Sequence, residues 1–213
     1  MSIIRKKAVF ILAAVAIYLC LPYAELAAET FKISNAVYLS GKMPAESHIG
    51  PGAFDTYLVQ GVPLKPVYEI YEKLAGSGTK KLINRGEAHI TVITPPEYNE
   101  ILKPYISMQE IERMAAVRNL QSFRFKVVGI GRAEAKIESK TEETYYLIVD
   151  SKDILEFRKS VFELYKKKGG AASRFDPCHY YPHITVGFTA RDLHESDGVK
   201  KGLNSLIFPV EEY

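Results

Sequence analysis

One tetrapeptide occurs twice in this chain of 213 residues: His-Ile-Thr-Val stands at 89–92 and again at 183–186. Both copies lie among β-branched and aromatic residues, which favour an extended strand. Side chains alternate across a strand, so histidine and threonine share one face while isoleucine and valine share the other. Each copy therefore predicts a strand whose isoleucine and valine are buried in the core and whose histidine and threonine project from the opposite face. If the two strands lie side by side, two imidazoles and two hydroxyls meet in one cleft.

The first 28 residues differ from the rest of the chain. Three basic residues at 5–7 precede an apolar run at 8–21, which is shorter than the roughly 20 residues that span a bilayer. Small residues follow at 27–28. This order is typical of a secretory signal peptide, so we predict an exported protein, secreted or periplasmic, with one mature domain at 29–213. The alternative is an uncleaved segment that anchors the protein in a membrane.

Charge and cysteine content narrow the classes of function. The signal segment carries three positive charges and one negative charge, so its removal lowers the formal net charge from +3 to +1. The mature domain is thus no polycation, and we expect neither a DNA duplex as partner nor membrane contact after the signal is removed. Cys178 is its single cysteine, which excludes an intrachain disulfide.

Periodicity predicts interleaved strands and helices. A Ser-x-x-Glu capping box at 107–110 and Ser151 mark two helix starts. Strands are expected at 31–39, 54–60, 88–94, 123–127, 144–150 and 181–188, and helices at 64–76, 107–118 and 151–168. This order favours an α+β domain made of two similar lobes.

The displayed side chains suit cleavage of a phosphodiester. One group must take a proton from the attacking oxygen and another must give a proton to the leaving oxygen. Histidine can do either near neutral pH, because its ordinary pKa is about 6.5. A threonine hydroxyl can donate a hydrogen bond to a phosphate oxygen.

Two H-x-T motifs on strands some ninety residues apart resemble the 2H phosphoesterase superfamily, which includes cyclic phosphodiesterases, the 2′,5′-RNA ligase group and RNA-end-processing enzymes. The resemblance implies a bilobal α+β fold, with two pseudo-symmetric lobes whose antiparallel sheets face a central groove and whose helices lie outside. The stretch 181–202 also resembles the branch associated with Swiss-army-knife RNA-repair proteins.

The resemblance also implies roles for four residues. His89 and His183 would be catalytic, and Thr91 and Thr185 would bind the substrate phosphate, with no metal and no cofactor. The first motif usually supplies the acid and the second the base, so His89 is expected to protonate the leaving oxygen and His183 to activate water. The reverse assignment stays open. The implied substrate is a nucleotide or RNA-end phosphodiester.

Other polar residues near the second motif are weaker candidates. Tyr181 and Arg191 flank it and are candidate substrate contacts, although a packing tyrosine and a solvated arginine are simpler interpretations. Cys178 and His179 are possible zinc ligands together with His183, but this spacing converges only on a helix, which the intervening Tyr-Tyr-Pro disfavours. A protease that uses Cys178 as its nucleophile is supported only by the presence of cysteine and histidine.

Two histidines outside the motifs, His48 and His194, lack a threonine two positions on and are expected at the surface or in loops. Two functions of other classes also stay open. The domain could bind a nucleotide or an RNA end without chemistry, or it could be a structural protein in which the repeated tetrapeptides form core strands. No residue pattern selects a base or distinguishes a cyclic nucleotide from an RNA end.

Overall fold

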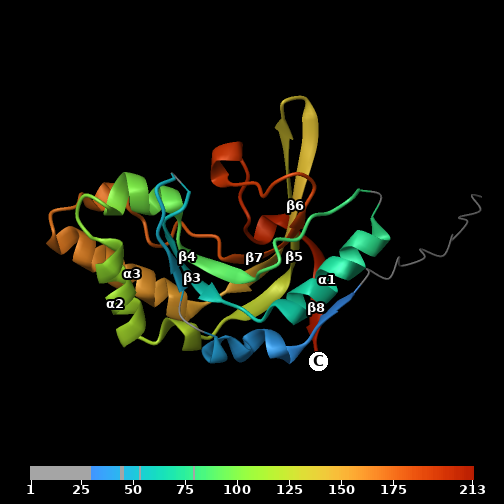
Figure 1. Ribbon diagram of the computed structural model, residues 1–213, viewed down its shortest axis with the longest axis horizontal. Coiled ribbons are helices and arrows are strands. Elements are labelled where there is room, and N and C mark those ends of the chain that lie inside the picture. Colours follow the sequence, from blue (N-terminus) through green and yellow to red (C-terminus); the bar gives the residue numbers. More distant parts are fainter. Residues whose placement is uncertain (1–29, 44–45, 53, 79) are drawn as a thin grey trace, which may run out of the picture.

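The computed structural model describes residues 30–43, 46–52, 54–78 and 80–213. Its strands are β1 (Phe31–Ile33), β2 (Glu46–His48), β3 (Tyr57–Gly61), β4 (His89–Ile93), β5 (Lys126–Ile137), β6 (Lys140–Asp150), β7 (His183–Phe188) and β8 (Leu206–Glu212). They form one open sheet in the order β1-β8-β5-β6-β7-β4-β3-β2 (Figure 1). Neighbouring strands are antiparallel except β1 and β8, which are parallel.

The α+β class is confirmed. The helices are α1 (Leu64–Ser77), α2 (Met108–Val117) and α3 (Lys152–Lys167), together with a π-helix at Glu97–Leu102 and a long 3-10 segment at Asn35–Lys42. The strands form one sheet rather than the two that we expected, and the bilobal pseudo-symmetry is not confirmed. The two motif strands, β4 and β7, are neighbours near the middle of this sheet.

The main core lies on the helix side of the sheet. Apolar side chains of all three helices are buried together with the isoleucines and valines of the two motif strands: Val67, Ile70, Ile111, Ile154, Phe157, Val161, Ile90, Val92, Ile184 and Val186. Burial of this apolar surface is the main driving force for folding. The buried half of each motif is therefore confirmed as core.

Local signals explain which predicted elements formed. Ser107 and Glu110 form the expected capping box, and the Ser151 hydroxyl accepts a hydrogen bond from the Ile154 amide at the start of α3. The strand expected at 31–39 was wrong beyond Ile33, because the Ser34 hydroxyl caps the 3-10 segment that follows.

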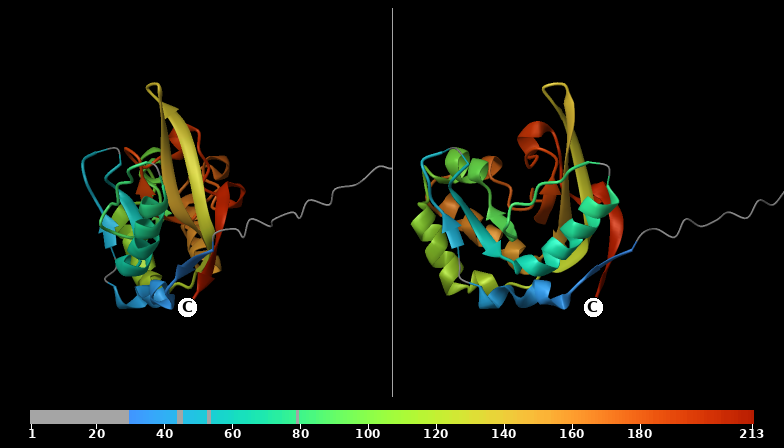
Figure 2. Two further views of the ribbon diagram at one scale, coloured as in Figure 1. Left: turned by 90° about the vertical axis from the view of Figure 1, so that its right-hand side faces the viewer. Right: turned by 45° about the vertical axis from the view of Figure 1, so that its right-hand side comes forward.

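The structure also differs from the prediction in where strands begin and in a strand that we did not expect. The strand expected at 123–127 starts only at Lys126, after a 3-10 turn at Leu120–Ser122, and it continues to Ile137. This strand and β6 form a long hairpin that projects from the body of the molecule (Figure 2). The last strand, β8, was not predicted.

A second, smaller core lies on the opposite face of the sheet. Tyr146 and Ile148 of β6 pack there with Leu193 and Val199 from the segment that follows β7. In the strand register Tyr146 lies opposite Thr185 and Ile148 lies opposite His183, so this core is on the side where the motif histidines project. The small core thereby fixes the 190–202 segment beside the second motif.

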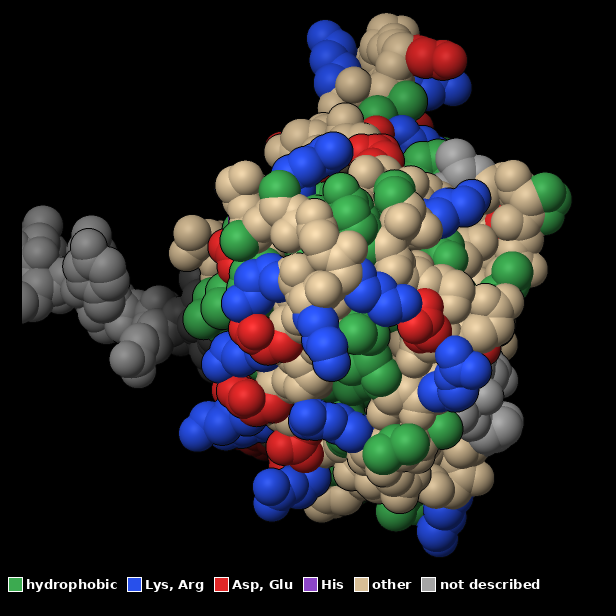
Figure 3. All heavy atoms as spheres, turned by 90° about the vertical axis from the view of Figure 1, so that its left-hand side faces the viewer, with side chains coloured by type: hydrophobic (Ala, Val, Ile, Leu, Met, Phe, Trp, Pro, Cys, Tyr) green, Lys and Arg blue, Asp and Glu red, His purple; other side chains and the backbone are tan. Residues whose placement is uncertain are grey.

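The surface on the side of α2 and α3 carries both signs of charge (Figure 3). Two of the three lysines that end α3 are engaged in ion pairs, Lys166 with Glu163 and Lys168 with Glu110. Cations also interact favourably with the carboxyl end of a helix. The run at 166–168 is therefore a helix terminus rather than a free basic track.

The segment 1–28, which we interpret as an export signal, lies outside the described residues. Among the helices that the structure describes, none combines the length and the apolar character needed to cross a bilayer.

The buried side chain of Arg158 links the first motif strand to the segment that precedes the second. Arg158 of α3 is 0% exposed and makes two bonds to the carboxylate of Glu97, at 2.6 and 3.0 Å. Its guanidinium also donates to the carbonyls of Val92 in β4 (2.8 Å) and of Pro177 before β7 (3.1 Å). The ring of Tyr180 lies 4.2 Å from the guanidinium. One side chain thus contacts both motif segments and the π-helix.

Glu97→Gln removes the charge that compensates Arg158. Because the guanidinium would stay buried without its counter-charge, we expect the free energy of unfolding to fall by about 3 kcal/mol in urea denaturation. Glu163→Gln, which breaks only an exposed ion pair on the same layer of helices, should change it by less than about 0.5 kcal/mol. Equal losses in the two variants would contradict a special role for the buried pair.

Candidate active site

The two motifs lie in register on adjacent strands. β4 and β7 pair antiparallel with Ile90 opposite Ile184. Continuing this register by one residue in each direction places His89 opposite Thr185 and Thr91 opposite His183. All four polar side chains therefore project from one face of the sheet, and both isoleucines project into the main core. The sequence suggested that the two motif strands could lie side by side. They do so by pairing directly within one sheet.

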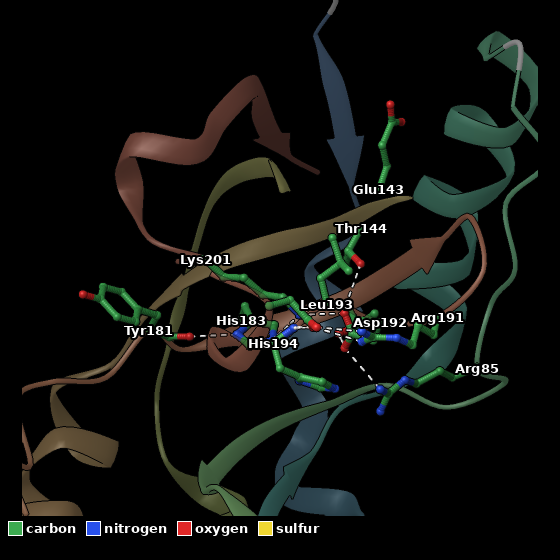
Figure 4. Close-up of polar contacts among 12 residues, drawn as sticks. Arg85, Glu143, Thr144, Tyr181, His183, Arg191, Asp192, Leu193, His194 and Lys201 are labelled. Atoms are coloured by element: carbon green, nitrogen blue, oxygen red, sulfur yellow. Dashed lines mark hydrogen bonds and ion pairs between the residues drawn. The ribbon is translucent and has the colours of Figure 1, made fainter. Parts of the chain in front are cut away.

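His183 is held from both sides by groups of fixed polarity. Its Nδ1 lies 2.7 Å from the carbonyl oxygen of Tyr181, and its Nε2 lies 3.2 Å from the Nζ of Lys201 (Figure 4). A carbonyl can only accept a hydrogen bond and an ammonium can only donate one. The neighbours therefore assign the proton to Nδ1 and the lone pair to Nε2, which is the neutral imidazole.

Burial and charge agree with this assignment. Burial lowers the pKa of His183, and the adjacent Lys201 ammonium lowers it further, to about 3. The hydrogen bond to Tyr181 and the Asp192 carboxylate act in the opposite direction and are outweighed. The ring also packs edge-on against Tyr146, with 5.6 Å between ring centroids. His183 is therefore a neutral imidazole near neutral pH.

His89 has a different set of neighbours. Its Nδ1 lies 3.6 Å from a carboxylate oxygen of Glu87, and its side chain is 14% exposed. Burial lowers the pKa of His89, and the Glu87 carboxylate opposes this effect. The ring centroid of Tyr57 lies 6.2 Å away. The first motif histidine is therefore paired with an anion and the second with a cation.

Asp192 is the centre of a polar network beside the second motif. Its carboxylate accepts hydrogen bonds from the Lys201 ammonium (2.7 Å), the Thr185 hydroxyl (3.0 Å) and the Arg85 guanidinium (3.1 Å). The side chains of Asp192 and Lys201 are each 5% exposed. Burial alone would raise the pKa of Asp192, but Lys201 outweighs this effect and holds the pKa at about 2. Asp192 thus remains ionised at neutral pH.

Sequence reasoning missed this network. Arg85, Asp192 and Lys201 share no spacing that marks a motif, and each is a residue type that normally lies at the surface. Only the fold brings them together, because the small second core packs the 190–202 segment against β6 and β7. The network uses the Thr185 hydroxyl proton, whereas the Thr91 hydroxyl makes no hydrogen bond to another described residue.

The two candidate substrate contacts hold other parts of the chain in place. Tyr181 acts on the site through its backbone carbonyl, and its ring packs edge-on against His179 at 5.4 Å between centroids. Arg191 makes two bonds to the carboxylate of Asp197 and one to the Asp192 carbonyl. Arg191 thereby holds the 191–197 turn, and substrate contact by either residue stays a prediction.

Cys178 and His179 form no metal site with His183 in the part of the chain that the structure describes. Cys178 is exposed, and His179 lies 3.3 Å from Glu195 rather than beside His183. Within the described residues no group of three or more potential metal ligands converges. His48, in β2, stacks on Tyr57 at 4.4 Å between centroids, and the exposed His194 stacks on Phe54 at 6.4 Å.

Asp192→Asn tests how much the buried charges contribute to the free energy of unfolding. The variant leaves Lys201 without its counter-charge, and we expect the free energy of unfolding to fall by about 3 kcal/mol at pH 7. Because the pKa of Asp192 is lower in the folded protein, its stabilisation is complete above about pH 4 and is lost as the pH falls toward 2.

Urea denaturation of wild type and variant at pH 7 and pH 3 therefore tests the network. The difference in stability should be large at pH 7 and should narrow at pH 3. Glu156→Gln breaks an exposed ion pair with Lys159 and serves as the control, with an expected change below about 0.5 kcal/mol. A difference between wild type and the Asp192 variant that does not depend on pH would rule out the charge as its source.

A family model described as "Swiss Army Knife, 2H phosphoesterase domain" matches residues 57–194, roughly two thirds of the chain. The matched segment contains both motif strands, and it ends before Lys201. No curated protein and no solved structure matches the chain.

Proposed function

The chain belongs to the Swiss Army Knife family of 2H phosphoesterase domains, and on that premise we propose that it hydrolyses a 2′,3′-cyclic phosphate or a related nucleotide or RNA phosphodiester. The family suggests phosphodiester hydrolysis as the reaction class. The observation that carries the finer proposal is the pairing of β4 and β7, which displays both histidines and both threonines on one face.

Hydrolysis in this site needs two proton transfers. The oxygen of a water molecule attacks phosphorus while the water gives a proton to Nε2 of His183. The bond from phosphorus to the ribose oxygen breaks, and His89 gives its proton to that oxygen. The products are a phosphomonoester and a free hydroxyl. His183 ends protonated and His89 ends neutral, and proton exchange with solvent restores the starting pair.

The neighbours of the histidines support this assignment of base and acid. The Tyr181 carbonyl holds the proton of His183 on Nδ1, so the lone pair is on Nε2, where the Lys201 ammonium contacts it in the substrate-free protein. Burial lowers the pKa of His89, but the Glu87 carboxylate opposes this effect, and the negative charge of a bound phosphodiester would oppose it as well. Thr91 is the threonine whose hydroxyl proton is available to a phosphate oxygen.

A pocket lined in part by Tyr57, whose ring centroid lies 6.2 Å from that of His89, supports a nucleotide as the substrate. It has a volume of about 320 Å³ and is lined by His48, Ile49, Gly50, Phe54, Asp55 and Tyr57. Aromatic side chains stack on bases without selecting a sequence. A nucleotide whose phosphate lies at the histidines would have space for its base here. The alternative function, a module that binds a nucleotide or an RNA end without turnover, would use the same pocket.

Hydrolysis of 2′,3′-cyclic nucleotides and of an oligonucleotide with a cyclic-phosphate end, measured in EDTA, tests the proposal. We expect turnover by the wild type, a loss of at least 10²-fold in His89→Ala and in His183→Ala, and about 10²-fold in Thr91→Val. His179→Ala, which changes a histidine outside the motifs, is the matched control and should retain activity. Turnover that survives in a folded His89→Ala variant would contradict the proposed mechanism. Binding without turnover would favour the alternative module.

We also propose that residues 1–28 are an export signal and that the enzyme acts outside the cytoplasm. The basic start, the short apolar run and the small residues at 27–28 support this. Expression of the full chain in a bacterial host should release a product that lacks about 28 residues, measured by intact-mass analysis of the exported fraction. A full-length product that stays in the membrane fraction would instead support the uncleaved anchor.

A further inference from the structure

Lys201 is a buried lysine with no role in the mechanism so far. It lies in the segment between β7 and β8, outside the residues that match the family model. We propose that Lys201 is a positioning residue that holds His183 neutral with its lone pair on Nε2, and thereby makes His183 the base and His89 the acid. This inference rests on the proposed function of the site.

The geometry fixes the ammonium between two acceptors. The Nζ atom lies 2.7 Å from Oδ1 of Asp192 and 3.2 Å from Nε2 of His183. The Nζ atom also lies over the ring of Tyr146, 5.4 Å from the ring centroid. A side chain that is only 5% exposed loses its hydration, so it needs such partners in order to remain charged. The carboxylate of Asp192 supplies that counter-charge.

Polarity then determines the state of His183. Protonation of Nε2 would point an N–H at an ammonium that can only donate, so the protonated ring loses a hydrogen bond and meets a like charge. The opposite tautomer, with its proton on Nε2, would in addition place the Nδ1 lone pair against the Tyr181 carbonyl oxygen. The neutral ring with its proton on Nδ1 is the one state that satisfies both neighbours.

The wider charge balance acts in the same direction. His183 is faced by Lys201 and Asp192 from the segment after β7, by His89 from β4, and by the neutral ring of Tyr146 from β6. Arg85 also reaches Asp192, so two positive side chains share one negative charge beside His183. By contrast, the carboxylate of Glu87 lies 3.6 Å from Nδ1 of His89. The two imidazoles of the pair are therefore differentiated by their neighbours.

During the reaction the lysine gives up its contact with His183 and keeps its ion pair with Asp192. Its contact with Nε2 is the longer of its two, so an attacking water can replace it while the bond to Asp192 holds the ammonium in position. Burial lowers the pKa of Lys201, and the Asp192 carboxylate opposes this effect. In the proposed mechanism Lys201 stays protonated and transfers no proton. After the water has given its proton to Nε2, the nearby positive charge favours return of that proton to solvent.

Nuclear magnetic resonance of the substrate-free protein with ¹⁵N-labelled histidine tests the inference. In the wild type, the His183 signals should report a neutral ring with its proton on Nδ1 and no titration above pH 5. In Lys201→Met the pKa of His183 should rise by at least one unit. Lys200→Met changes the exposed neighbouring lysine and should leave the titration of His183 as in the wild type.

The same variants then enter the hydrolysis assay. The acid limb of kcat/KM should move to higher pH in Lys201→Met by the amount that the resonance titration gives, and Lys201→Arg should restore much of the wild-type profile. A purely structural lysine would change stability without moving that limb.

Two results would overturn the inference: a wild-type His183 whose proton lies on Nε2, or a folded Lys201→Met protein in which His183 titrates as before. The tautomer is read on the wild type, so a variant that fails to fold does not prevent the test. Absence of turnover would contradict the proposed function but leave the resonance result intact, so the two failures are distinguishable.

Discussion

The antiparallel pairing of β4 with β7 is the constraint on which the site depends. A slip of one residue would turn His183 and Thr185 into the helix-side core and bring isoleucine and valine to the open face. Burial of Ile90 and Ile184 opposes such a slip. Arg158 adds directional bonds, because its fixed guanidinium geometry reaches a carbonyl of each motif segment and the Glu97 carboxylate at once.

On the face of the sheet that carries the motif histidines, two identical motifs form a site whose two halves differ. Two identical tetrapeptides supply identical side chains, and the pairing of their strands relates them nearly symmetrically. Segments outside the motifs remove that symmetry. The 190–202 segment brings a lysine and an aspartate to His183, while the residues just before β4 bring Glu87 to His89. General acid–base catalysis needs an acid and a base in one site, and different neighbours can give two equal groups different pKa values.

Much of the local structure could be predicted because its causes are local. The Ser107 capping box, the Ser151 cap and the alternating motif strands depend on residues a few positions apart, and all three formed as expected. The features that were missed altogether are stabilised by distant partners. β8 carries little local signal, since most of its residues are exposed, and it forms by pairing with β5 and β1. The union of all strands in one sheet is likewise a matter of long-range pairing.

The sequence by itself determined which four side chains are displayed, because strand alternation assigns each residue to a face without reference to the rest of the fold. The repeated tetrapeptide and its apolar half also indicated the reaction class. Only the tertiary structure decided what surrounds those side chains. Arg85, Asp192 and Lys201 are separated from one another along the chain and share no periodicity, so their meeting at His183 depends on the packing of the 190–202 segment. Electrostatic fields act through space, and the protonation of His183 is therefore a property of the fold.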